Sequence, residues 1–174
     1  MNFNVHPIFV HFPIALLSIY SVFEFIRFKK IKKLPYWFYL KATMVILGFI
    51  GAVLAAQTGD IAKAVIDDPA TNPIIHVHEM WAKATIVIFG ILAAAYFVAW
   101  LWTYPMIQQK VVNFKIIQLI RKLQQIIMRD WLVILLSAAG LIALIITGSL
   151  GGSIVYGFQS DPFTQLIGKL FFGM

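Results

Sequence analysis

Four long apolar stretches constrain this chain more than any other feature of its sequence. They run from Pro7 to Ile26, Tyr36 to Ala56, Met80 to Tyr104 and Trp131 to Leu150. The hydrocarbon core of a bilayer, about 30 Å thick, is crossed by about 20 helical residues. Because lipid offers no partner for peptide groups, an isolated span must be an α-helix. The sequence therefore predicts an all-α, integral membrane four-helix bundle, with residues 1–174 as one domain.

The composition agrees with a membrane protein and excludes several kinds of site. Hydrophobic residues make up 61% of the chain and charged residues 12%, which is outside the range of ordinary soluble domains. The chain has no cysteine. Disulfides, iron–sulfur clusters, thiolate zinc sites and covalently attached haem are therefore excluded.

The cations are gathered on one side of the predicted membrane. Eleven of the 14 lysines and arginines lie at the connections between the first and second spans and between the third and fourth. They are Arg27, Lys29, Lys30, Lys32, Lys33, Lys41, Lys110, Lys115, Arg121, Lys122 and Arg129. By the positive-inside rule this side is cytoplasmic, so the protein is multi-pass with both termini extracytoplasmic and the N-terminus outside. Anionic lipid headgroups explain the net charge of +7 without nucleic acid as a partner.

Two shorter segments are predicted to be surface helices. Residues Lys110 to Arg129 place apolar and basic side chains on opposite faces, as expected for a helix lying on the inner membrane surface before the fourth span. At the C-terminus, Asp161 followed by Pro162 is typical of a helix start. We expect a second amphipathic helix there, on the outer surface.

All four histidines fall at the outer ends of two spans: His6 and His11 open the first, and His76 and His78 open the third. On a helical wheel, His11 shares its face with Ala15 and Ser18, and His78 shares its face with Ala82 and Thr85. Small residues in membrane helices mark faces that pack against other helices. The pattern therefore predicts that His11 and His78 point inward, while His6, which precedes a proline, and His76 lie at the rim.

Inward histidines at this position suit a cofactor. The positive end of a helix dipole and desolvation both disfavour a cation, so these imidazoles should be neutral, the form that binds metals. The leading interpretation makes His11 and His78 the axial ligands of one haem iron. His6 and His76 are alternative metal ligands. A lone interfacial histidine more often contacts headgroups, but four on one side favour a shared site.

Other motifs have ordinary structural interpretations. The sequence "QTGD", Gln57 to Asp60, is typical of a helix end with Gly59 in the left-handed cap. Small residues along the fourth span favour close helix packing, although they also leave room for a flat cofactor. Glu79 and Lys83, four residues apart, are predicted to form an ion pair. The sequence shows no nucleophile–base pair, phosphate loop or carboxylate dyad. Catalysis is therefore undecided, with a non-catalytic or quinol-linked redox subunit as the two options.

Four motifs together resemble a known family. They are "HPIFVHFPIALL", "QTGD", "HVH" at the start of the third span and "GGSIVYG" after the fourth. In this order they resemble the bacterial inner-membrane family called domain of unknown function 2231, and the chain is also distantly similar to membrane b-type cytochromes. The resemblance implies a four-helix protein of the bacterial inner membrane, associated with respiratory or cytochrome-bearing systems. Histidines near only one face imply a single, outward haem.

Three functions are compatible with these residues. The first is an electron-transfer protein with one non-covalent b-type haem near the outer face, held by His11 and His78. It would exchange electrons with quinol or an extracytoplasmic cytochrome, within a homo- or hetero-oligomeric complex. The second is a haem-free copper- or zinc-binding protein in which the four histidines gather near Glu79 or Met80. The third is a cofactor-free anchoring subunit.

Overall fold

The computed structural model describes residues 6–64, 71–111 and 114–173, and every regular element in these ranges is a helix. In chain order the helices are α1 (His6–Phe25), α2 (Lys29–Lys32), α3 (Pro35–Lys63), α4 (Asn72–Leu101), α5 (Pro105–Val111), α6 (Lys115–Ile127), α7 (Asp130–Tyr156) and α8 (Pro162–Phe172). Four of them, α1, α3, α4 and α7, are long and apolar enough to cross a membrane. The predicted all-α architecture with four spans is confirmed.

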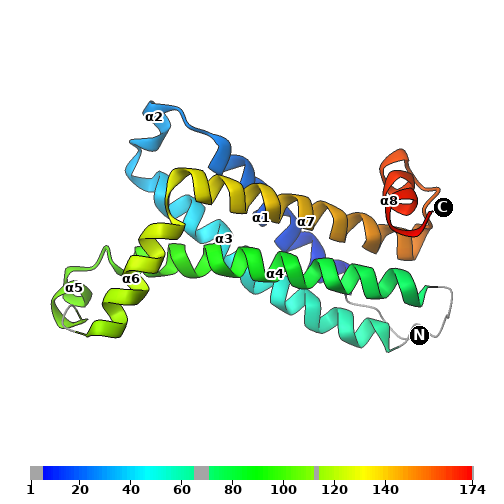
Figure 1. Cartoon of the computed structure of the whole chain (residues 1–174), viewed down its shortest axis with the longest axis horizontal. Coiled ribbons are helices and arrows are strands. Elements are labelled where there is room, and N and C mark those ends of the chain that lie inside the picture. Colours follow the sequence, from blue (N-terminus) through cyan, green and yellow to red (C-terminus); the bar gives the residue numbers. More distant parts are fainter. Residues whose placement is uncertain (1–5, 65–70, 112–113, 174) are drawn as a thin grey trace.

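The four long helices form a ring in which α1 packs on α3, α3 on α4, α4 on α7 and α7 on α1. Helices α1 and α4 are therefore diagonal to each other. Figure 1 shows α2, α5 and α6 at one end of the bundle and α8 at the other, where α1 and α4 begin. We call the first the basic end, because α2 and α6 carry lysines and arginines there, and the second the histidine end.

The outer surface of the ring is apolar. Large hydrophobic side chains remain exposed on each of the four long helices, among them Val22, Leu47, Ile50, Val87, Ile91, Leu135 and Ile142. An exposed apolar belt of this extent is unfavourable in water and favourable in hydrocarbon. The bundle is therefore built to be solvated by lipid.

The second and third spans extend further toward the histidine end than their apolar stretches indicate. Helix α3 continues to Lys63 and α4 begins at Asn72. Gly59 lies inside α3, and among the described residues only Gly157 and Gly173 have positive φ, so the predicted left-handed cap at Gly59 is wrong. Polar residues end the apolar stretch but not the helix, because the backbone hydrogen bonds of a helix form with polar side chains as well as with apolar ones.

The surface segments also differ in part from expectation. The amphipathic helix before the fourth span begins at Lys115, with Phe114 as its extended N-cap residue, rather than at Lys110. Helix α8 begins where predicted. The Asp161 carboxylate accepts hydrogen bonds from the backbone N–H groups of Phe163 and Thr164, at 2.8 and 3.0 Å.

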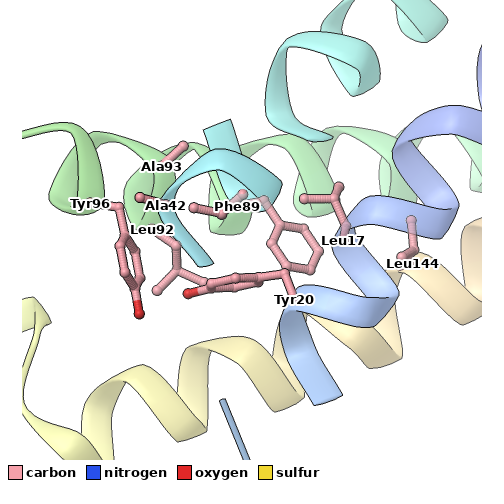
Figure 2. Packing of buried hydrophobic residues seen from close by; sticks show 9 residues of the cluster. Leu17, Tyr20, Ala42, Phe89, Leu92, Ala93, Tyr96 and Leu144 are labelled. Atoms are coloured by element: carbon pink, nitrogen blue, oxygen red, sulfur yellow. The ribbon is translucent and has the colours of Figure 1, made fainter. Parts of the chain in front are cut away.

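The core fills the middle of the ring with large side chains. Tyr20, Phe89 and Tyr96 are fully or almost fully buried, and Figure 2 shows them packed between α1 and α4. Two glycines permit this packing: a Cβ atom would lie 2.6 Å from Leu17 at Gly48 and 2.9 Å from Phe89 at Gly140. The small residues of the fourth span therefore do allow close approach, as predicted.

The cap of α8 should depend on pH. The Thr164 backbone N–H, helped by the Phe163 N–H, holds the pKa of Asp161 below its usual range. A lowered folded pKa means that the stabilisation is complete above the pKa of a free Asp, about 3.9, and is lost as the pH falls through the folded value. We expect amide exchange at Phe163 and Thr164 to be accelerated severalfold by Asp161→Ala at neutral pH, measured by hydrogen exchange.

The matched control is Asp161→Asn, because asparagine caps without a charge. It should keep the exchange slow at neutral pH and remove most of the acid sensitivity. Equal exchange in the wild type and in Asp161→Ala would contradict the capping role.

Candidate functional site

Two histidines lie on the interior faces of diagonal helices. The buried residues of α1 include Pro13, Leu17, Tyr20 and Glu24, and His6 precedes Glu24 by 18 residues. Eighteen residues make about five helical turns, so His6 lies on the same line of α1 as Glu24. On α4 the same spacing separates His78 from buried Tyr96. Both imidazoles therefore lie at the mouth of the bundle interior, at the histidine end.

His6 is held by the end of α3. Its Nδ1 lies 3.1 Å from Thr58 Oγ1, and that hydroxyl donates its own proton to the Ala55 carbonyl at 2.9 Å. His6 Nδ1 must therefore be the donor to Thr58. The ring also packs against Gly59, where a Cβ atom would lie 3.2 Å from the ring carbon Cε1.

His78 is held in a parallel way by α7. Its Nδ1 donates to the Thr147 carbonyl at 3.0 Å, because a carbonyl can only accept. Its ring packs against Gly151, where a Cβ atom would lie 3.2 Å from Cε1. In both histidines the hydrogen bond at Nδ1 favours the tautomer with the proton on Nδ1. This tautomer, fixed by an oxygen acceptor at Nδ1, is the arrangement that metal-binding histidines adopt.

These two imidazoles lie at the same end of the bundle. His6 is in the first turn of α1 and His78 is in the second turn of α4, on helices that are diagonal to each other. The pair faces the interior from opposite sides, with α3 behind one ring and α7 behind the other. Two imidazoles in this arrangement could bind one metal centre between them.

The orientation expected for His11 differs from the structure. His11 is exposed and donates from Nδ1 to the carbonyl of Pro7, four residues earlier in its own helix. The reason is that the buried face of α1 is not the face of small residues on which His11 lies. Pro13, Leu17 and Tyr20 form the buried face of α1. His6 lies on this face of the helix, and His11 lies on another. His76 is exposed, as expected for a rim residue.

The small-residue face beside His11 lines a groove instead of a helix contact. A cavity of about 400 Å³ lies between α1, α7 and α8, and its walls include Ile14, Ser18, Gly148, Gly152, Tyr156 and Phe163. None of the histidines lines it. At Gly148 and Gly152 a Cβ atom would meet no other atom within 4 Å. Close packing of the fourth span is therefore limited to the faces that carry Gly140 and Gly151.

Within the described part of the chain, no three side chains of histidine, aspartate or glutamate are grouped as a metal site. Glu79 bonds to Lys63 of α3 at 2.6 Å, rather than to Lys83 as predicted. The carboxylate is thus used to join α3 and α4. The inward-facing candidate metal ligands at this end are therefore two, His6 and His78.

Sequence reasoning missed a second polar cluster, at the other end of the interior. Glu24 has 1% of its side chain exposed and accepts hydrogen bonds from Lys41 Nζ, at 2.9 Å, and from the Tyr96 hydroxyl. The charge pattern placed Lys41 with the cations of the inner membrane surface and did not single out Glu24. The signal was present, because both lie inside predicted apolar spans, where an ionisable residue is expected to have a buried partner.

A comparison with protein families found one match. The family described as a predicted membrane protein, DUF2231, matches residues 2–161. No curated protein and no solved structure matches the chain. The match covers all four membrane-spanning helices and both histidine pairs.

The histidine tautomers can be tested directly. In protein labelled with ¹⁵N-histidine, we expect His6 and His78 both to give the signals of an Nδ1-protonated ring. Thr58→Val keeps the shape of the side chain and removes the acceptor of His6. It should convert His6 to a mixture of tautomers and leave His78 unchanged, because His78 bonds to a backbone carbonyl. Thr103→Val, at the basic end, is the control and should change neither; an unchanged His6 in Thr58→Val would contradict the assignment.

Proposed function

We propose that this chain, which belongs to the DUF2231 family of predicted membrane proteins, transfers electrons within a lipid bilayer by means of one b-type haem. The haem would be held non-covalently at the histidine end of the bundle. The observation that carries the proposal is the pair of inward imidazoles on α1 and α4, each with Nδ1 bonded to an oxygen.

The donor set fits this cofactor. A bis-imidazole haem needs two neutral histidines that face each other from different helices, and a bundle interior supplies the apolar surroundings. Gly59 and Gly151 support the same interpretation, because a methyl group at either position would crowd a histidine ring. A bis-imidazole haem requires two protein ligands, one on each side of the iron.

The geometry favours His6 and His78 as the ligands. The sequence predicts His11 and His78, and His11 remains the alternative ligand on α1. Its exposed position and its bond to Pro7 make it the weaker candidate. His76 is exposed on α4 and is a metal ligand only in the copper or zinc alternative.

Each residue has a definite task in this proposal. A bound haem supplies a one-electron carrier. His6 and His78 supply nitrogen lone pairs, and Thr58 and the Thr147 carbonyl keep each ring turned inward. Ile74 of α4 and Leu150 of α7 belong to a buried apolar cluster at this end.

The position of the site decides what kind of partner is required. From His6 to Glu24 the helix rises about 27 Å, so a cofactor at the histidine end does not reach the basic end. We infer that electrons are exchanged at the histidine end, with quinol in the bilayer or with an extracytoplasmic cytochrome, within a larger complex. By the positive-inside rule, the basic end faces the cytoplasm of a bacterial cell and the N-terminus lies outside.

An optical spectrum of the detergent-purified protein tests the proposal. Expressed with haem supplied, the protein should show a sharp Soret band and, when reduced, resolved α and β bands. We expect His6→Ala and His78→Ala to lower haem content more than about tenfold, since even the outer partners of metal ligands are worth that much. His76→Ala should keep the wild-type spectrum.

The His11→Ala variant separates the two possible ligand pairs. Retention of haem supports His6, whereas loss in His11→Ala with retention in His6→Ala supports the pair predicted from sequence. Colourless protein containing stoichiometric copper or zinc would overturn the haem proposal in favour of the metal-binding alternative.

A further inference from the structure

A carboxylate, an ammonium group and a phenol meet inside the bundle, far from the histidines. Glu24 of α1 accepts from Lys41 of α3 at 2.9 Å and from the Tyr96 hydroxyl of α4. Ionisable groups in a membrane interior are costly and are kept mainly where they have a task. An ion pair is also weak evidence for stability, because desolvation offsets much of its attraction. The cluster therefore calls for a functional explanation.

Further hydroxyl groups surround the Glu24 carboxylate. Tyr20 and Tyr96 meet edge to face, with ring centroids 5.7 Å apart, and Figure 2 shows their hydroxyl ends converging. The Tyr20 hydroxyl also lies beside Ser137 of α7, and neither of these two hydroxyls meets the geometry of a hydrogen bond. All four spans thus contribute a polar side chain to one buried place.

From this place a series of charged groups leads to the basic end. The exposed fraction of the side chain rises from 1% at Glu24 to 13% at Lys41, 29% at Arg27 and 68% at Asp130. Arg27 lies 3.9 Å from Glu24 and bonds to Asp130 at 3.0 Å, and Lys32 of α2 bonds to the same carboxylate. Because a guanidinium does not lose its proton, Lys41 is the group in this series that can pass one to Glu24.

Toward the histidine end the same interior is closed. Leu17, Phe89 and Leu92 have no exposed surface, and Leu144 is 6% exposed. In Figure 2, Phe89, Leu17 and Leu144 lie on the side of Tyr20 away from Tyr96. Beyond them lie Thr85 and Thr147, which donate to carbonyls of their own helices and whose hydroxyl oxygens lie 3.4 Å from each other across α4 and α7. A proton on Glu24 therefore has polar neighbours on one side and hydrocarbon on the other.

We propose that Glu24 is a proton-binding site inside the membrane that exchanges protons with the basic end alone. The Lys41 ammonium gives a proton to the Glu24 carboxylate, which leaves a neutral amine and a carboxylic acid. The amine then takes a proton from water at the basic end. The cluster has gained one proton and one positive charge, and release runs through the same groups in reverse. Tyr96 donates to Glu24 in both states and keeps its proton.

Infrared difference spectroscopy tests the site in the whole protein, with or without a cofactor. The protein is placed in vesicles of phosphatidylcholine and phosphatidylglycerol, and orientation is measured by labelling lysines with an impermeant reagent. The carbonyl band of a protonated carboxylic acid should contain a component that Glu24→Gln removes and Glu79→Gln keeps. Glu79→Gln is the matched control, because it removes the ion-paired carboxylate of the histidine end.

The same component should report sidedness. It should appear at once when the solution at the basic end is acidified, and only after the pH has equilibrated when the histidine end is acidified. An equally fast response from both ends, or a carboxylic acid band unchanged by Glu24→Gln, would overturn the proposal.

A second variant decides the matter if Glu24→Gln does not fold. Tyr96→Phe keeps the packing and removes the hydroxyl that bonds to Glu24, so the component should move to higher frequency as its carbonyl loses a donor. A band that stays in place in Tyr96→Phe would also overturn the proposal. Loss of haem in the histidine variants has no bearing on this result, so the two proposals fail separately.

Discussion

Lipid accepts no hydrogen bonds, and this constraint explains where most polar side chains of the spans find their partners. Short hydroxyl side chains bond to carbonyls four residues earlier in their own helices, as Ser21 does with Leu17 and Ser153 with Ser149. Longer polar side chains turn inward and find partners on other helices. The structure therefore collects its chemistry along the axis of the bundle and leaves hydrocarbon outside.

The fold was predictable because hydrophobicity alone decides it. Four stretches of sufficient length, with cations between them, predict four helices whose outward faces are apolar, and the structure has them. The helix ends were less predictable. Thr58, Gly59 and Asp60 look like a terminus, yet α3 runs through them. Hydropathy reports where lipid stops, whereas backbone hydrogen bonds decide where a helix stops.

The sequence indicated which types of residue form the candidate sites, but not which of their side chains point into the bundle. Two membrane crossings separate the start of the first span from the start of the third. The histidines at these two positions are therefore on the same side of the membrane. Which histidine of α1 faces inward depends on which face of the helix is buried, and that face carries Pro13, Leu17 and Tyr20 rather than Ala15. Glu24 was hidden for another reason. A single carboxylate near the end of an apolar stretch looks like a surface charge until Lys41 and Tyr96 are seen around it.

The diagonal placement of α1 and α4 has a mechanical consequence. Their side chains meet in the core, where Tyr20 of α1 packs on Phe89 and Tyr96 of α4, but at the histidine end His6 packs on α3 and His78 packs on α7. The separation of His6 and His78 therefore depends on how α3 and α7 pack against α1 and α4. A substitution in α3 or α7 that changes this packing would therefore also change the distance between the two rings, without touching either histidine.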